Sequence, residues 1–346
     1  MAESNTFNSD KRLSWIDYSR GIGIILVVYG HVVRGLKDPG ILSLDHTFWG
    51  YSDTFVYSFH MRLFFVLSGY FFLRSFKKEP SDFILKKVQT LIYPFVIWSV
   101  LQTIVEVLLS KYTNGKVAPI QILECIIIPR AQFWFLYTLF FINVLSFIFY
   151  KISIKYGLYI STIVWLACFI FQPQLGPFNT TFNYLLFFNI GIVFSQLDKS
   201  FLSFLKNYIF SALTIIAFCV VEYIFLFSNT KPISLYRAVM LPFLGSLAVM
   251  QVAAMAVRKN ILNFFVYLGK ESLPIYLAHV LVASGIRIVL FKILKIHNPI
   301  IHVLLGTIAG IIVPLILYSF VMKRRYLSML FSYPKKHKLL KNNVPS

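Results

Sequence analysis

Apolar runs long enough to cross a lipid bilayer recur along almost the whole 346-residue chain. A membrane-spanning helix needs about 20 mostly apolar residues. Runs of about this kind lie at residues 15–35, 53–73, 89–110, 132–150, 157–172, 182–197, 204–227, 235–257, 271–292 and 300–322. Hydrophobic residues make up 58% of the chain and charged residues only 13%, which excludes soluble domains with a solvated surface. The sequence therefore predicts an all-α fold, a polytopic membrane helix bundle of about ten transmembrane helices.

The fifth and sixth of these runs are short. They flank the segment QPQLGPFNTTFN, which is rich in Gly, Pro and Asn. Because such residues favour turns over helix, we expect one of the two helices to be tilted, kinked or only partly inserted.

The net charge of +20 is spread unevenly along the chain. Lysines and arginines are concentrated in every second connecting segment and in the two terminal segments. Under the positive-inside rule this places both termini in the cytoplasm, with 1–13 as a cytoplasmic segment, 14–322 as the transmembrane domain and 323–346 as a basic cytoplasmic tail. Anionic membrane lipids account for the excess basicity, so we expect membrane lipids and no nucleic acid among the partners.

The first apolar run, RGIGIILVVYGH, contains Arg20 and His31. A helix turns about 100° and rises about 1.5 Å per residue, so these side chains share one face about 16 Å apart. A charge at mid-membrane costs roughly 2.5 to 3.5 kcal/mol and normally faces a bundle interior, so the pair indicates a functional site. The alternatives are a snorkelling Arg20 and a His31 that only hydrogen-bonds a neighbouring helix. Asp17 lies three residues before Arg20, where it either pairs with the arginine or marks the helix start.

The second run, FVYSFHMRLFFVLSGYFFLRSFKK, also contains polar residues. His60 and Arg62 lie in one half, and we expect His60 to lie at the depth of His31 in the adjacent antiparallel helix. Arg74 and Lys77 lie at the end of this segment. They indicate either a phosphate-binding mouth or the ordinary positive-inside bias.

Two later segments add candidate residues of weaker specificity. In LGKESLPIYLAHVLV, Ser272, Tyr276 and His279 share one helical face, which lines either a pocket or a helix interface. Trp134 begins the run WFLYTLFFINVL, where an interfacial aromatic belt is the simpler explanation.

These segments together resemble the membrane-bound acyltransferase 3 family, which includes bacterial polysaccharide O-acetyltransferases and fucose O-acetylase-like proteins. The resemblance rests on four motifs in order: WIDYSRGIGIILVVYGH, FHMRLFFVLSGYFF, FWFLYTLFF and LGKESLPIYLAH. Arg20 and His31 match the family's arginine and histidine separated by ten residues. The chain departs from the family at Lys77, where arginine is common, and at Arg62, where proline is frequent.

The resemblance implies an enzyme of the bacterial plasma (inner) membrane. It would move an acetyl group from cytoplasmic acetyl-CoA to a sugar hydroxyl of a surface polysaccharide or its lipid-linked precursor. Segment 14–322 would then be the acyltransferase domain. The three cysteines are scattered without metal-ligand spacing, and we expect no metal.

The same resemblance suggests roles for the polar residues. His31 would act as general base or transient acyl carrier, with Arg20, Asp17 and His60 as further catalytic residues. The coenzyme would lie lengthwise between Arg20 and His31. Its phosphates would be held by Arg20, Arg74 and Lys77. Candidate contacts to the acceptor are Arg62, Trp134, Tyr276 and His279.

Two other classes of function remain open from sequence. A transporter or flippase for an anionic lipid-linked sugar would use the same basic interior without coenzyme A. A membrane scaffold would not depend on His31 at all. Stabilisation of the protein by acetyl-CoA distinguishes the enzyme from the transporter, and loss of activity in His31→Ala distinguishes it from the scaffold.

Overall fold

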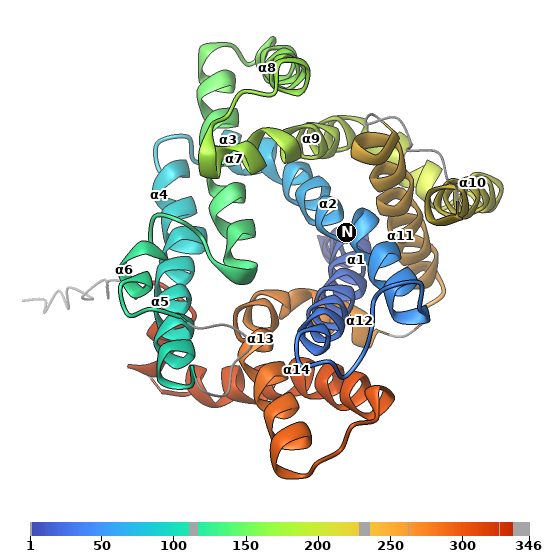
Figure 1. Ribbon diagram of the computed structural model, residues 1–346. Coiled ribbons are helices and arrows are strands. Elements are labelled where there is room, and N and C mark those ends of the chain that lie inside the picture. Colours follow the sequence, from blue (N-terminus) through green and yellow to red (C-terminus); the bar gives the residue numbers. More distant parts are fainter. Residues whose placement is uncertain (1, 111–116, 228–235, 262, 325, 335–346) are drawn as a thin grey trace, which may run out of the picture.

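The computed structural model describes residues 2–110, 117–227, 236–261, 263–324 and 326–334, and all regular structure in these ranges is helical (Figure 1). Within these ranges, nine helical segments are long and apolar enough to cross a membrane. They contain α1 (Ala2–Lys37), α2 (Phe48–Tyr70) with α3 (Phe72–Lys78), α4 (Phe83–Lys87) with α5 (Tyr93–Leu108), α7 (Trp134–Ile152), α9 (Asn179–Leu205), α10 (Tyr208–Phe227), α11 (Leu241–Arg258), α13 (Ser272–Ile288) and α14 (Pro299–Met322). The predicted all-helical membrane fold is confirmed.

Nine of the ten expected runs form helices of membrane-spanning length in these ranges, and the fifth run forms a shorter apolar helix. Its helix, α8 (Gly157–Phe171), has 15 residues. At 1.5 Å per residue it is about 22 Å long, against a hydrocarbon core of about 30 Å. The helix ends at Gln172, which adopts the left-handed conformation just before the Pro-rich turn. Of the two runs expected to be irregular, this one is short, whereas α9 is a full-length helix of 27 residues.

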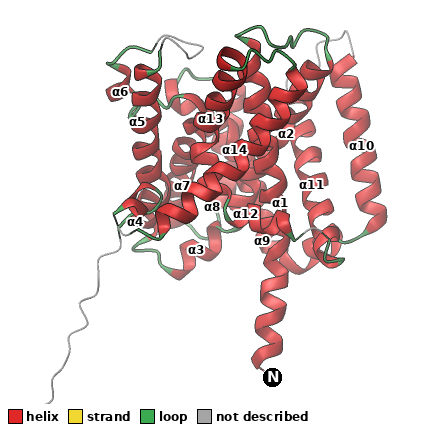
Figure 2. Cartoon of the chain, turned by 90° about the horizontal axis from the view of Figure 1, so that it is seen from below, coloured by secondary structure: helices red, strands yellow, loops and turns green. Residues whose placement is uncertain are grey.

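Helix α1 is the central element of the bundle. It packs against α2, α11, α13, α14 and the short helix α12 (Phe264–Lys270). Figure 2 shows its first turns projecting beyond the other helices. Both ends of the predicted arginine-to-histidine face therefore lie inside a ring of helices rather than against lipid.

The contact between α1 and α12 is unusually close. A Cβ atom added at Gly269 would overlap the backbone carbonyl of Asp17, and one added at Gly21 would overlap the carbonyl of Phe265. Glycine at these positions lets the two backbones meet, as small residues do in membrane helix pairs. The consequence is that Lys270, at the end of α12, lies close to Asp17 and Arg20 of α1.

Candidate functional site

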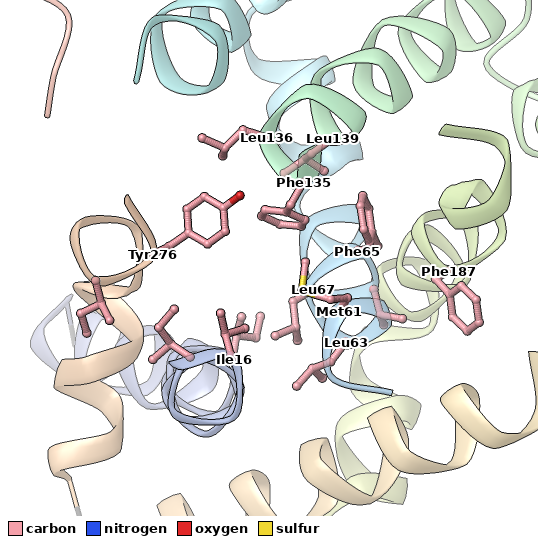
Figure 3. Packing of buried hydrophobic residues seen from close by; sticks show 14 of the residues in the cluster. Ile16, Met61, Leu63, Phe65, Leu67, Phe135, Leu136, Leu139, Phe187 and Tyr276 are labelled. Carbon is pink, nitrogen blue, oxygen red and sulfur yellow. The ribbon is translucent and has the colours of Figure 1, made fainter. Parts of the chain in front are cut away.

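A cavity of about 310 Å³ opens between α1, α2, α7, α12, α13 and the segment from Lys87 to Leu91. Its volume is at the lower end of the range found for small-molecule sites. Apolar side chains form most of its wall: Ile24, Val27, Met61, Phe64, Leu91, Phe135, Leu136, Leu139 and Leu273. Figure 3 shows the Tyr276 side chain pointing from α13 toward Phe135 and Leu136 of α7. We call this cavity the wide cavity.

Three cations line the wide cavity: Arg20, Lys87 and Lys270. Arg20 Nη1 lies 3.6 Å from Asp17 Oδ1, which is the ion pair expected from the sequence, and the guanidinium carbon lies 5.3 Å from the Phe71 ring centre. The nearby Asp17 carboxylate also acts on Lys270. One carboxylate against three cations leaves an excess of positive charge, which is an environment suited to phosphate groups.

The inner end of the wide cavity is formed by Tyr276. Its hydroxyl donates a hydrogen bond to the backbone carbonyl of Gln132, which ties α13 to the start of α7. The Tyr276 ring centre lies 6.1 Å from the His279 ring centre, which in turn lies 5.1 Å from the ring centre of His31. A line of rings thus leads from the wide cavity to the histidine of the first motif.

Backbone contacts fix the tautomer of two buried histidines. His279 Nδ1 lies 2.8 Å from the carbonyl oxygen of Tyr276 and 3.1 Å from that of Ile275. His60 Nδ1 lies 2.6 Å from the carbonyl oxygen of Val56. Carbonyl oxygens only accept, so in a neutral ring each Nδ1 carries the hydrogen and each Nε2 is an acceptor. His279 Nε2 is buried and has no hydrogen-bond partner among the described residues.

A second, much smaller cavity lies at the other end of the α1 face. Its volume is about 30 Å³, enough for one or two water-sized groups. We call it the narrow cavity, and its lining consists of His31, Val32, Gly35, Leu36, Val280, Ala283, Ser284, Arg287 and His302.

Arg20 and His31 therefore line different cavities, although they share one face of α1 as predicted. The expected single passage between them is not continuous in this conformation. Tyr276 and His279 of α13 occupy the space along the line. Helical periodicity places two side chains of one helix, but it does not reveal what a distant helix inserts between them.

The other predicted site residues form two groups outside these cavities. Arg74 and Lys77 are exposed on α3 and are not among the residues lining the wide cavity. Arg62 and Trp134 lie on either side of Tyr184: the Arg62 guanidinium carbon is 5.2 Å from the Tyr184 ring centre, and the Trp134 and Tyr184 ring centres are 5.2 Å apart. Arg62 also donates to the Tyr57 carbonyl at 3.2 Å and forms no ion pair with any described residue.

Sequence reasoning did not single out four residues of the two cavities: Lys87, Lys270, Arg287 and His302. The LGKESLP motif, which contains Lys270, could have indicated this residue. Arg287 could have been identified because a charge within a membrane helix indicates a functional site. Lys87 had no signal beyond the general basic bias of its segment. Among the described residues, no group of three His, Cys, Asp or Glu side chains is placed to hold a metal ion.

The helical spans, the cationic cavity and the buried histidines define a polytopic membrane protein with an internal cavity lined by cations and apolar side chains. The Acyl_transf_3 family model, described as an acyltransferase domain, matches residues 13–319, and the chain belongs to this family. It is accordingly a membrane acyltransferase, which agrees with the resemblance of its four motifs and not with the transporter or scaffold alternatives. No curated protein and no solved structure matches the chain.

Proposed function

We propose that this enzyme is an O-acetyltransferase that moves an acetyl group from acetyl-CoA to a sugar hydroxyl of a surface glycan or its lipid-linked precursor, in the plasma membrane of a bacterium. The observation that carries the proposal is the cation-lined wide cavity leading toward a layer of buried histidines within an acyltransferase family domain. Acyl transfer needs a place for an anionic coenzyme, a base and a place for the hydroxyl. The two cavities and His31 supply all three.

Coenzyme A has a phosphorylated nucleotide end and a flexible arm that carries the thioester. In the proposed arrangement Arg20, Lys87 and Lys270 hold the phosphates nearest the arm, since these three cations line the wide cavity. The exposed Arg74 and Lys77 on the adjacent α3 contact the phosphates farther out. The apolar wall formed by Ile24, Met61, Leu136 and their neighbours surrounds the arm.

His31 acts as the general base in this proposal. Its ring takes the proton of the acceptor hydroxyl as the oxygen forms a bond to the thioester carbonyl carbon. The carbon–sulfur bond then breaks, and the coenzyme leaves as a thiol after receiving the proton from His31. His60 and His279 present acceptor nitrogens, which suits them to orient an N–H group of His31 rather than to stabilise an oxyanion.

The Tyr276 side chain has to move for this reaction to occur. Its ring stands at the inner end of the wide cavity, and a thioester must pass it to reach His31. Rotation would break the hydrogen bond to the Gln132 carbonyl, which coenzyme binding has to offset. Tyr276 is then a gate between the thioester in the wide cavity and His31.

The acceptor approaches from the opposite end of the bundle in this proposal. The narrow cavity lies next to His31 on the side away from Arg20, so a hydroxyl placed there and a thioester in the wide cavity reach the same imidazole from two directions. Arg62 and Trp134 form, with Tyr184, a second polar and aromatic surface for parts of the acceptor beyond the reacting sugar.

The proposal is tested by adding isotopically labelled acetyl-CoA to purified protein in lipid nanodiscs and by comparing glycan acetylation in cells with and without the gene product. We expect acetyl-CoA to raise the melting temperature and the labelled acetyl group to appear in the glycan by mass spectrometry. Desulfo-coenzyme A, which has no acyl group, should stabilise the protein without supporting transfer. Unchanged stability at saturating acetyl-CoA together with unchanged glycan acetylation would contradict the proposal.

A further inference from the structure

We propose that the narrow cavity binds a second hydroxyl of the acceptor, next to the one that is acetylated, so that the enzyme selects an uncharged vicinal diol. This inference rests on the proposed function and adds the chemical class of the acceptor. It is carried by three polar side chains that share the narrow cavity with His31: Ser284, Arg287 and His302.

Arg287 supplies fixed hydrogen-bond donors. Its side chain is 8% exposed, and Nη1 donates to the Gly35 carbonyl at 2.6 Å, which anchors the guanidinium between α13 and α1. A guanidinium has five N–H groups and no acceptor, so it offers donors only. Asp38, just after α1, acts electrostatically on Arg287. Because this charge already has an acidic counterpart, an anionic ligand is not needed to balance it.

His302 supplies a fixed acceptor. Its Nε2 lies 2.8 Å from the carbonyl oxygen of Ile296, so Nε2 carries the hydrogen in the neutral ring and Nδ1 is left with a lone pair. The side chain is 1% exposed, and Nδ1 has no hydrogen-bond partner among the described residues. A buried acceptor without a partner is costly, which favours a ligand that donates to it.

A hydroxyl group satisfies both neighbours at once, because it donates one hydrogen bond and accepts others. A carboxylate would accept from Arg287 but would place lone pairs against His302 Nδ1. An ammonium group would donate to His302 but would place its charge against Arg287. The combination of a donor-only and an acceptor-only side chain therefore fits a hydroxyl and rejects both charged groups.

The size of the narrow cavity limits the distance between the two hydroxyl groups of the acceptor. About 30 Å³ excludes a whole sugar ring but admits the edge of one. Since His31 lines the same small space, a hydroxyl held by Arg287 and His302 lies beside the hydroxyl that His31 deprotonates. Neighbouring carbons of a sugar ring carry hydroxyls at such a spacing.

The test uses purified wild-type protein in nanodiscs, labelled acetyl-CoA and three small probes: cyclohexanol, cyclohexane-1,2-diol and 2-hydroxycyclohexane carboxylate. We expect kcat/KM for the diol to exceed that for each of the other two by about tenfold, the value of one well-made hydrogen bond. Equal rates with cyclohexanol, or a preference for the carboxylate, would overturn the inference. Transfer to none of the probes would overturn it as well, and the labelled-glycan experiment decides separately whether the proposed function fails with it.

Two variants test whether His302 causes the preference for the diol. His302→Phe removes the acceptor and should reduce the diol preference to about threefold or less, whereas His302→Asn places an amide oxygen near the position of Nδ1 and should retain most of it. His297→Asn is the matched control, because His297 is exposed and does not line the narrow cavity. Each variant is first shown to be stabilised by acetyl-CoA, and the wild-type comparison stands alone if a variant does not fold. A diol preference that survives in His302→Phe would contradict the assignment.

Discussion

The two cavities of this acyltransferase differ in size, charge and hydrogen-bonding character. The wide cavity has about ten times the volume of the narrow one, and its polar lining includes three cations. The narrow cavity combines one buried arginine with the buried acceptor nitrogen of His302. In our proposal the first environment recognises charge on a large ligand, and the second recognises individual hydrogen bonds on a small group. The proposal thereby assigns donor and acceptor to separate ends of one bundle.

Replacing His31 is expected to have the largest effect on this division. His31→Ala should lower acetyl transfer by a factor of about 10²–10⁴, the usual contribution of a general base, and leave stabilisation by acetyl-CoA unchanged. His297→Ala is the control for removal of an imidazole. Glycan acetylation measured by mass spectrometry at matched protein levels gives the result, and retained acetylation in His31→Ala would refute the role of this histidine.

Removing charge from the wide cavity should affect donor binding and little else. Lys87→Met combined with Lys270→Met is expected to raise the KM for acetyl-CoA by about tenfold or more, because charge-assisted hydrogen bonds to phosphate are lost. The KM for the acceptor should stay the same. Lys155→Met with Lys199→Met removes two exposed charges elsewhere and serves as the control. A rise confined to the acceptor KM would reverse the assignment of the cavities.

The mouth of the wide cavity also depends on the close contact of α1 and α12. Gly269→Ala should destabilise the protein by about 1–3 kcal/mol, since the added methyl group overlaps the Asp17 carbonyl. Gly285→Ala is the matched control because nothing lies within 4 Å of its added Cβ. Thermal unfolding followed by tryptophan fluorescence compares the two. Equal melting temperatures would show that α12 does not need to approach so closely.

The exposed pair on α3 should have the smallest effect. Arg74→Ala with Lys77→Ala is expected to weaken acetyl-CoA binding by about threefold, and the effect should fade as salt is raised because exposed charges are screened. Titration of the melting temperature with acetyl-CoA at low and high salt measures it. A larger loss than that of the Lys87 and Lys270 double variant would place the main phosphate contacts on α3 instead.

The sequence predicted the features that depend on one helix at a time. Hydropathy gave the helical membrane fold, and periodicity correctly placed Arg20 and His31 on one interior face of α1. Of the two alternatives for Asp17, an ion pair with Arg20 or a helix-start carboxylate, the structure has the ion pair. The fifth run does form a helix, and it is short because the turn after Phe171 ends it after 15 residues.

The features that the sequence did not predict depend on contacts between distant segments. Lys270 lines the same cavity as Arg20 because glycines allow α12 to cross α1 closely, and neither segment alone indicates this contact. Tyr276 and His279 separate the two cavities because α13 leans against the start of α7 through the Gln132 carbonyl. The acceptor character of His302 follows from the loop carbonyl of Ile296, which only the folded backbone places.

The central claim is that donor and acceptor enter from opposite ends of the bundle. The most direct test measures acetyl transfer between substrates held on opposite sides of a membrane. Sealed vesicles that contain the protein are loaded with glycan acceptor, and labelled acetyl-CoA is supplied only outside. The reverse loading is the second arm, and both substrates on the outside are the third. If donor and acceptor use opposite ends of the bundle, label enters the glycan when the two substrates are on opposite sides of the membrane and not when both are confined to one side. Efficient labelling with both substrates on the same side alone would contradict the account.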